Sequence, residues 1–297
     1  LKREIRRLEN KKELESRRLI MIEREFHSLK EEIKKLFGDL ETKYAEKIPY
    51  YFDFFRRFVY AFQNFLITNL YYIGPLREYP QRYYIASGEY PRDVGLRGEH
   101  SVEIIYFDFR QNESRYAKLK EWMKSMDLAY DIKLKPIVEG LYALVIVDPK
   151  LKIEINLADV GFGASQLLPI LVEGIYAGKG TLLLIEQPEI HLHPRLQSML
   201  ADFFIDLIKD GKQVIVETHS EHMIFRLQRR IAEGRISNQD VAIYYFEPSK
   251  NGTKITSIEL DKYGVMKSWP KGFFEEEVED IFSFLRAIGE KKNVFSD

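Results

Sequence analysis

Two short apolar runs, each ending abruptly in polar residues, constrain the fold of this chain more than any other feature. Residues 182–185 (LLLI) lead into EQPE, and residues 214–216 (VIV) lead into ETH. One amphipathic segment of helix length separates the two runs. Strand, helix and strand at this spacing form a right-handed crossover between parallel strands. Open α/β sheets bind ligands at the carboxyl ends of such strands, so the sequence predicts a ligand site at this edge.

Composition narrows the possible functions. The net charge of the 297 residues is −1 and 31% are charged, so no overall basic field indicates nucleic-acid or membrane binding. The absence of cysteine excludes disulfides and thiolate metal sites. No apolar run approaches the ~20 residues that span a bilayer, and no signal peptide is visible. We therefore expect a soluble cytoplasmic protein with no membrane partner. Because the chain opens with Leu1 inside a helical pattern, we also expect it to be part of a longer polypeptide.

Residues 1–70 are predicted to form a helical arm. The apolar residues of its first part alternate spacings of three and four, which is the heptad pattern of a coiled coil. They are Leu19, Ile22, Phe26, Leu29, Ile33, Leu36 and Leu40. We interpret residues 1–47 as a solvated helical hairpin or long helix, with a nucleic-acid contact as the alternative. Residues 51–69 are densely aromatic and predict a helix that is apolar on most sides and hence buried.

Residues 71–246 are predicted to form the core domain. Residues 72–105 contain Gly, Pro and Arg at short intervals, so we expect an ordered loop that joins short strands or turns. Arg77 in this loop is a candidate for an anion contact or a structural ion pair. An amphipathic helix is expected at 114–130. Three strands follow, at 132–136, 141–147 and 151–157.

A cluster of glycine and serine precedes the next helix. Pro169 is tolerated only in the first turn of a helix, so this helix is predicted to begin at Ala164 or Ser165. Unpaired N–H groups at a helix start bind anions, and Gly161 and Gly163 would allow close approach. The competing interpretation is a tight strand-to-helix turn in which Ser165 is only the N-cap.

The remaining elements are predicted from their boundary residues. Pro194 begins the helix of the crossover and Gly211 ends it. Residues 221–234 predict another helix and residues 241–246 another strand. A small C-terminal unit is expected over residues 247–297. Its elements are a hairpin turn at 248–252, a strand at 254–260 and a final helix at 275–288.

Together these motifs resemble a known family. LLLIEQPEIHLHP is similar to an ABC-type Walker B strand with its following loop, ETHSEH to the switch-histidine loop, and VGFGASQ to the signature motif. Their order matches ABC-type ATPases of the SMC/RecF and OLD-like branch. With YIGPLRE and SWPKGFF added, the chain resembles bacterial AAA-family ATPases that end in a C-terminal domain of unknown function. The resemblance implies an α/β fold, the C-terminal lobe of a P-loop NTPase ABC-type head, with a parallel sheet and flanking helices.

The resemblance also implies roles for individual residues. Glu186 matches the carboxylate that orders Mg²⁺, and His219 matches the group that senses or donates to the γ-phosphate of ATP. The signature residues would close on ATP held by a partner subunit, which implies a homodimer. They are Gly161, Gly163, Ser165 and Gln166. His191 and His193 would cap or hydrogen-bond the loop at the dimer interface.

Two departures from the family pattern bear on activity. Most ABC enzymes have Asp-Glu where this chain has Glu186 and Gln187, so an amide stands at the position of the general base. Gln187 can orient water, and either Glu189 takes over as the base or hydrolysis is slow. The second departure is that no G-x-x-x-x-G-K-[ST] loop occurs in the sequence, and a chain without it lacks most of its ATP affinity. We expect that loop to lie N-terminal to this chain.

The expected function is ATP hydrolysis with Mg²⁺ that drives closure of a head dimer. By resemblance, the wider role is DNA maintenance or anti-phage defence, with DNA, an effector or a nuclease as partner. The alternative is a catalytically weak scaffold that senses nucleotide or dimerises for such a partner. A zinc site is a further alternative, disfavoured because no H-E-x-x-H helix is present. Its candidate ligands are His191, His193, His219 and His222, with Glu186, Glu189, Glu217 and Glu221.

Overall fold

The computed structural model describes residues 31–32, 34–35, 38, 49–111, 113–250, 252–267 and 283–288. The chain separates into two compact units, Leu1–Thr68 and Asn69–Asp297, and each is described by itself. The seven residues of the expected heptad seam all lie outside the described residues. Of the expected final helix, only residues 283–288 lie within them, and these are helical.

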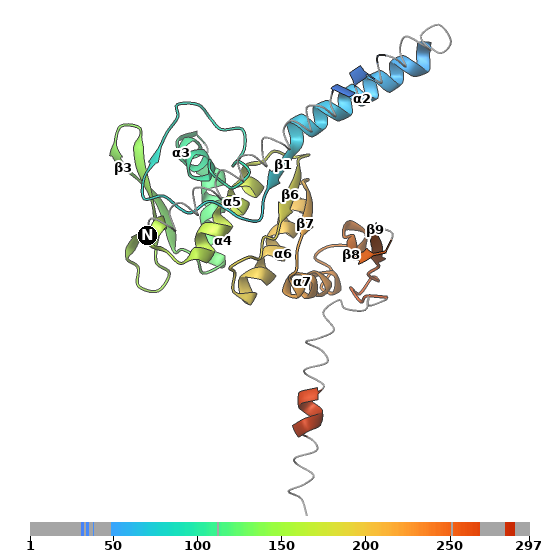
Figure 1. Cartoon of the computed structure of the whole chain (residues 1–297). Helices are drawn as coiled ribbons and strands as arrows, with labels where there is room; N and C mark the ends of the chain where they lie inside the picture. The colour runs from blue at the N-terminus through green and yellow to red at the C-terminus, as the bar shows by residue number, and fades with distance from the viewer. Residues whose placement is uncertain are drawn as a thin grey trace, which may run out of the picture. The chain divides into compact units, whose positions relative to one another are not determined.

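The aromatic segment forms helix α2, Pro49–Asn69, as expected (Figure 1). Its expected burial is wrong, because Phe54, Tyr60 and Ile67 expose 68%, 67% and 57% of their surface. The density of aromatic residues predicted a helix that is apolar on most sides. Burial also requires a second apolar surface, and the described residues of this unit do not supply one. The sequence pattern therefore predicted the secondary structure but not the environment.

The larger unit is built on a parallel sheet of order β1-β6-β7 (Figure 1). Its strands are Leu70–Ile73, Leu182–Glu186 and Gln213–Glu217. Helix α6, Pro194–Lys209, makes the crossover from β6 to β7 and ends before Gly211, as predicted. The α/β class with a parallel sheet and flanking helices is confirmed. Strand β1 was not predicted, because its four residues directly follow α2, and Tyr71 and Tyr72 continue the aromatic run of that helix.

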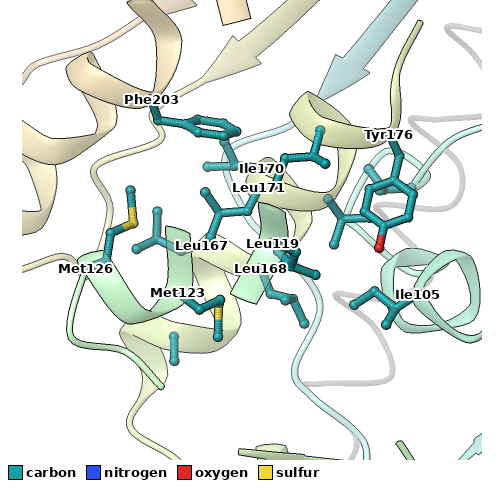
Figure 2. Packing of buried hydrophobic residues seen from close by; sticks show 14 of the residues in the cluster. Ile105, Leu119, Met123, Met126, Leu167, Leu168, Ile170, Leu171, Tyr176 and Phe203 are labelled. Atoms are coloured by element: carbon teal, nitrogen blue, oxygen red, sulfur yellow. The ribbon is translucent and has the colours of Figure 1, made fainter. Parts of the chain in front are cut away.

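Helices cover one face of this sheet. Ile73, Leu183 and Ile185 point to that face and are buried among residues of α6 and of helix α5, Phe162–Tyr176. Figure 2 shows the centre of this core, where α5 meets α6 and the helix α4, Glu113–Ser125. The residues labelled there are Ile105, Leu119, Met123, Met126, Leu167, Leu168, Ile170, Leu171, Tyr176 and Phe203. The core thus fixes the sheet against α5.

The opposite face of the sheet is apolar but partly exposed. Tyr72, Leu184 and Ile215 lie side by side in register across β1, β6 and β7. Tyr72 and Ile215 expose 37% and 57% of their surface. Parallel sheets are ordinarily covered on both faces. This apolar face runs along the strands up to Glu186 and Glu217 at their carboxyl ends.

A second, antiparallel sheet has the order β2-β4-β3, with β5 pairing with β4. Its strands are Tyr84–Ile85, Asp131–Val138, Leu141–Val147 and Glu154–Asn156, and the 3-10 helix η1, Leu157–Asp159, follows. The three strands predicted here and helix α4 are confirmed. Helix α3, Ser101–Gln111, was not predicted, because its first residues were assigned to the preceding loop rich in Gly and Pro.

The C-terminal elements pack on the end of α6. Helix α7, Glu221–Ala232, and the 3-10 helix η2, Asn238–Asp240, lead into the hairpin of β8, Ile243–Ser249, and β9, Gly252–Ile258. These elements match the predicted helix, strand, turn and strand. A small cluster, Ile205, Ile231, Ile236 and Leu260, joins α6, α7 and the segment after the hairpin. None of the described helices is long and apolar enough to cross a membrane.

Candidate functional site

A buried arginine fixes the carboxyl end of β6. Arg77 is 2% exposed, and its guanidinium donates from Nη2 to the Glu186 carbonyl at 2.8 Å and from Nη1 to the Gln187 carbonyl at 3.1 Å. Burial lowers the pKa of Arg77 to about 10, and the charge of Glu189 opposes that change. The group is therefore still charged at neutral pH, and hydrogen bonds from a charged donor are the stronger ones. Arg77 binds main-chain carbonyls here, not the anion or acidic partner that the sequence suggested.

The loop that carries Arg77 is anchored to helix α5 through a second loop. Main-chain hydrogen bonds of 2.9 and 2.8 Å join residues 74–78 to residues 96–97. Val94 donates its N–H to the carboxylate of Glu173 in α5 at 2.7 Å. Glu173 is buried, and burial raises its pKa to about 7. The end of β6 and helix α5 therefore belong to one hydrogen-bonded framework.

Gln187 turns the chain sharply where β6 ends. Its φ of 42° lies in the left-handed region, which costs a non-glycine residue about 1–2 kcal/mol. Its N–H donates to the Glu217 carbonyl at 2.8 Å, and its carbonyl accepts from Arg77. Its side-chain Nε2 lies 3.4 Å from Glu217 Oε1. The turn thus points the Gln187 amide toward the end of β7.

Glu189 holds the loop that follows β7. Its Oε1 accepts the main-chain N–H of His219 at 2.6 Å, while its Oε2 is buried without a hydrogen-bond partner in the described part of the chain. The imidazole of His219 remains 78% exposed. The structure brings these two predicted site residues together, and it does so through the backbone of His219.

Two carboxylates lie side by side at the end of the sheet. Glu186 and Glu217 are register partners on adjacent parallel strands, so their side chains stand on the same face. Tyr72 stands on that face as well. Burial, a hydrogen bond to Glu186 and the charges of Glu186 and Glu217 raise the pKa of Tyr72 to about 12. This edge is therefore acidic and suited to a cation.

The Gln187 amide and the His219 imidazole both lie close to the carboxylate of Glu217. Its Oε1 lies 3.4 Å from Gln187 Nε2 and 3.6 Å from His219 Nε2, and its side chain is 52% exposed. Gln187, Glu217 and His219 therefore form one compact group that solvent can reach. Gln187 and His219 were predicted as site residues from the sequence, and Glu217 only as a candidate zinc ligand.

The start of α5 differs from the prediction. The helix begins at Phe162 with Gly161 as its N-cap, not at Ala164 or Ser165, and Pro169 lies inside it. Ser165 as the N-cap is therefore wrong as well. Gly98 packs against this proline, since a Cβ on Gly98 would lie 2.4 Å from the Pro169 Cγ. Tertiary packing has overridden the usual avoidance of proline inside a helix.

The signature residues divide into an outer and an inner pair. Gly161 is exposed, and a Cβ on Gly163 would lie 3.5 Å from the His191 carbonyl oxygen, so this glycine packs against the loop after β6. Ser165 and Gln166 are buried, with exposed fractions of 5% and 2%. The structure therefore places Gly161 at the surface, Gly163 half-buried beside that loop, and the two polar side chains inside.

The two histidines of the loop have local structural roles. His193 is the N-cap of α6, and its Nδ1 accepts the Arg195 N–H at 3.3 Å. His191 has a left-handed backbone with a φ of 62°. Ser220 caps α7 in the same manner, and its Oγ also donates to Gln197 of α6 at 2.7 Å. His193 thus caps a helix within this chain, and the predicted contact of both histidines across a dimer interface stays a prediction.

The described residues contain no group of three or more His, Asp or Glu side chains that could hold a metal ion by themselves. Mg²⁺ uses fewer protein ligands, because one or two carboxylates suffice beside phosphate oxygens and water. The residues that sequence reasoning missed are Arg77 as a support and Glu217 as a site member. For Glu217 a signal existed, since it ends a strand beside Glu186. For Arg77 no such signal existed, because it is one of several arginines in the loop at 72–105 and nothing in the sequence sets it apart.

Two family models match the chain. The model described as AAA ATPase domain matches residues 1–224, and the model described as a protein of unknown function, DUF3696, matches residues 236–283. No curated protein matches it. These two matches confirm the expected AAA-family ATPase with a C-terminal region of unknown function.

Several solved structures are similar to the chain at low sequence identity. They include an Smc head bound to the C-terminal winged-helix domain of ScpA (17% identity, 57% of this chain and 48% of that chain, TM-score 0.41). A structure from work on ATP-driven dimerisation and DNA-stimulated activation of SMC ATPases also matches (15% identity, 61% of this chain and 96% of that chain, TM-score 0.38). A third match is an Smc head with an extended coiled coil bound to the C-terminal domain of ScpA, derived from Pyrococcus furiosus (13% identity, 63% of this chain and 42% of that chain, TM-score 0.39). The aligned region spans about half the length of the first of these.

The family assignment rests on the AAA ATPase domain model, which covers most of the chain. Its match includes the end of β6, the loop after it and the start of α7, where the candidate site lies. The chain therefore belongs to the AAA ATPase domain family.

Proposed function

We propose that the edge formed by β6 and β7 binds Mg²⁺ and the γ-phosphate of ATP, and that the chain hydrolyses ATP as one head of a homodimer. One observation carries the proposal: Glu186, Gln187, Glu217 and His219 converge at the carboxyl ends of two neighbouring parallel strands. This is where open α/β sheets bind ligands. Membership of an ATPase family supports ATP as that ligand.

The residues at this edge fit Mg²⁺. Carboxylate oxygens are the ligands that Mg²⁺ prefers, and Glu186 presents one on an edge where Glu217 adds a second negative charge. When bound, Mg²⁺ neutralises charge that develops on the transferred phosphoryl group. We assign Glu186 as the residue that holds it.

The polar side chains around Glu186 have separate roles in this proposal. The exposed imidazole of His219 donates to a γ-phosphate oxygen, while Glu189 holds the main chain of His219 in place. Gln187 orients the attacking water through its amide. Preorganised donors of this kind stabilise charge in the transition state without reorganising during the reaction.

The phosphate-binding loop is proposed to come from a polypeptide segment outside the 297 residues. No G-x-x-x-x-G-K-[ST] occurs within them. The partly exposed apolar face of Tyr72, Leu184 and Ile215 offers such a segment a surface that leads directly to Glu186. Covering that face would also give the parallel sheet its second layer.

Dimerisation is proposed to bring the start of α5 onto the nucleotide of a second copy. Gly163, in the first turn of α5, lies against the loop that contains His191 and His193, and Gly161 next to it is exposed. The helix start presents N–H groups suited to phosphate. Contact of the buried Ser165 and Gln166 with that nucleotide requires the first turn of α5 to open on dimerisation.

The proposal is tested by removing the imidazole. His219→Ala in the protein that carries both this chain and its phosphate-binding loop is expected to lower kcat for ATP by about 10²- to 10³-fold, the usual loss for one transition-state donor. His222→Ala, three residues along the same segment, is the matched control and is expected to stay near wild-type activity. Full ATPase activity in the His219 variant would sink the proposed site.

A second candidate function is a nucleotide-sensing scaffold that dimerises but turns ATP over slowly. The observation that favours it is Gln187, an amide at the position of the family's general base. Sedimentation velocity with and without ATP and Mg²⁺, combined with a phosphate-release assay, separates the two. Nucleotide-dependent dimers without phosphate release would favour the scaffold.

The wider role that we propose is DNA maintenance or anti-phage defence, with DNA or a partner effector or nuclease. It rests on the resemblance of the motifs to the SMC/RecF and OLD-like branch. Stimulation of ATPase activity by duplex DNA at two salt concentrations tests the DNA part, because phosphate contacts release counterions and weaken with salt. Stimulation that is insensitive to salt would argue against direct contact with the DNA backbone.

A further inference from the structure

Hydrolysis of ATP at this site leaves one question open, namely which group takes the proton of the attacking water. The question, and the inference that follows, rest on the proposed function. The amide of Gln187 can orient water but has no basic lone pair that binds a proton strongly at neutral pH. A general base has to lie within hydrogen-bond reach of the water, directly or through one other water.

Glu189, two residues beyond Gln187 in the chain, is badly placed for this step. Its Oε1 already accepts the N–H of His219 at 2.6 Å. Its Oε2 is buried, so water does not reach it. The negative charge of Glu189 also acts on the buried guanidinium of Arg77. Oε1 is thus occupied by the main chain of His219, and Oε2 is enclosed within the loop.

Glu217 has the opposite properties. Its side chain is 52% exposed, and it stands on the same sheet face as Glu186, the proposed Mg²⁺ ligand. The Gln187 amide and the His219 imidazole, which we assign to the water and the γ-phosphate, lie 3.4 and 3.6 Å from its Oε1. A water held by Gln187 beside the γ-phosphate is therefore within reach of this carboxylate.

We propose that Glu217 is the catalytic base that replaces the carboxylate missing at position 187. The water oxygen forms a bond to the γ-phosphorus, and the bond from that phosphorus to the bridging oxygen of ADP breaks, its electron pair leaving with ADP. The proton of the water passes to a carboxylate oxygen of Glu217 and from there to solvent, which reaches the side chain. The products are ADP and inorganic phosphate.

The arrangement predicts a functional exchange between positions 187 and 217. The two side chains touch, since Gln187 Nε2 faces Glu217 Oε1. A carboxylate placed at 187 would contact the same water from the other side of the pair. Gln187→Glu combined with Glu217→Gln keeps one amide and one carboxylate and merely swaps them, so the double variant retains the net charge of the site.

The experiment compares Glu217→Gln, Glu189→Gln and the double variant Gln187→Glu/Glu217→Gln in the protein with its phosphate-binding loop. Single turnovers at saturating ATP and Mg²⁺ are quenched, and bound ATP and ADP are separated by chromatography. Glu217→Gln is expected to lower kcat by about 10²- to 10⁴-fold, the contribution of a general base, and to trap uncleaved ATP in the protein. The double variant is expected to recover at least about 10-fold of that loss.

Two further variants complete the design. Glu247→Gln on the β8–β9 hairpin, where Glu247 pairs with Lys254, is the matched control and is expected to leave kcat unchanged. Glu217→Asp keeps the charge but withdraws it by one methylene, so a loss of about 10-fold or more is expected even if Glu217→Gln proves unstable. Thermal unfolding of each variant is followed in parallel, and a midpoint near wild type is expected for Glu217→Gln because its side chain is exposed.

The outcomes separate the inference from the proposed function. A Glu217→Gln variant within about 10-fold of wild type, or a larger loss for Glu189→Gln than for Glu217→Gln, overturns Glu217 as the base. A raised requirement for Mg²⁺ with normal kcat at saturating Mg²⁺ also overturns it and makes Glu217 a second metal ligand. A wild-type protein that binds ATP and Mg²⁺ but never cleaves ATP refutes the proposed hydrolysis itself.

Discussion

Replacement of Arg77 by lysine is the sharpest test of how the site is supported. Lysine keeps the charge and much of the aliphatic stem, but its ammonium is a point donor and not a planar fork. The two carbonyls that Arg77 binds, those of Glu186 and Gln187, lie on successive residues at 2.8 and 3.1 Å from its two terminal nitrogens. One ammonium cannot hold both with that geometry.

The magnitude follows from the hydrogen bonds that are lost. A hydrogen bond to a charged group contributes about 1.5–3 kcal/mol, and lysine is expected to keep one of the two at best. We therefore expect Arg77→Lys to lower the free energy of unfolding by about 2–3 kcal/mol. The end of β6 should also loosen, and a displacement of about 1 Å at a catalytic group can cost on the order of 100-fold in rate. We expect kcat to fall by about 10- to 100-fold, with ATP affinity nearly unchanged.

The assay combines stability, exchange and rate. Urea unfolding gives the change in free energy, and hydrogen exchange reports the Gln187 N–H, which is bonded to the Glu217 carbonyl. Arg82→Lys is the control: Arg82 forms an exposed ion pair with Asp159, so we expect a change of less than about 0.5 kcal/mol. A stability loss in Arg77→Lys no greater than in Arg82→Lys, with unchanged exchange at Gln187, would refute the reasoning.

Three further predictions concern the framework behind the site. Burial raises the pKa of Glu173 to about 7 from 4.5, so the folded state keeps a proton that the unfolded state releases. The free energy of unfolding should therefore fall by about 3 kcal/mol as pH rises from 4.5 to 7. Glu173→Gln should remove this pH dependence in urea titrations at several pH values. Gly174→Ala should cost about 1–3 kcal/mol, because the new Cβ would lie 2.6 Å from the Phe203 Cζ; an unchanged thermal midpoint would contradict that packing. Ser220→Ala should cost about 1–2 kcal/mol, since Ser220 Oγ accepts the Met223 N–H at the start of α7 and donates to Gln197 Oε1; an unchanged midpoint in the same melts would contradict this cap.

The parts of the fold that sequence predicted are those with clear boundaries. The crossover from β6 through α6 to β7 was predicted because Pro194 and Gly211 delimit an amphipathic helix between two apolar strands. Strand β1 and helix α3 were missed, since one directly continues the aromatic run of α2 and the other follows a loop rich in Gly and Pro. Strand β1 is formed by its pairing with β6, which lies more than 100 residues away in the sequence.

The candidate site was predicted at the level of its edge but not of its contacts. Motif resemblance predicted roles for Glu186, Gln187 and His219, and in the structure all three lie next to Glu217. Glu189 contacts the backbone of His219, which lies 30 residues away in the sequence. Arg77 contacts the end of β6, more than 100 residues away. No periodicity carries such information. The burial of Ser165 likewise follows from a helix that begins at Phe162, which local rules about proline placed too late.

The central claim is that the β6–β7 edge holds the Mg²⁺ and γ-phosphate of ATP, and Glu186→Gln tests it most directly. In the protein with its phosphate-binding loop, steady-state phosphate release is measured across a Mg²⁺ titration for wild type, Glu186→Gln and the control Glu154→Gln, whose carboxylate pairs with Lys133 on the antiparallel sheet. The account predicts a loss of more than about 100-fold for Glu186→Gln, with ATP still bound, and wild-type behaviour for Glu154→Gln. Wild-type phosphate release with an unchanged Mg²⁺ requirement in Glu186→Gln would contradict it.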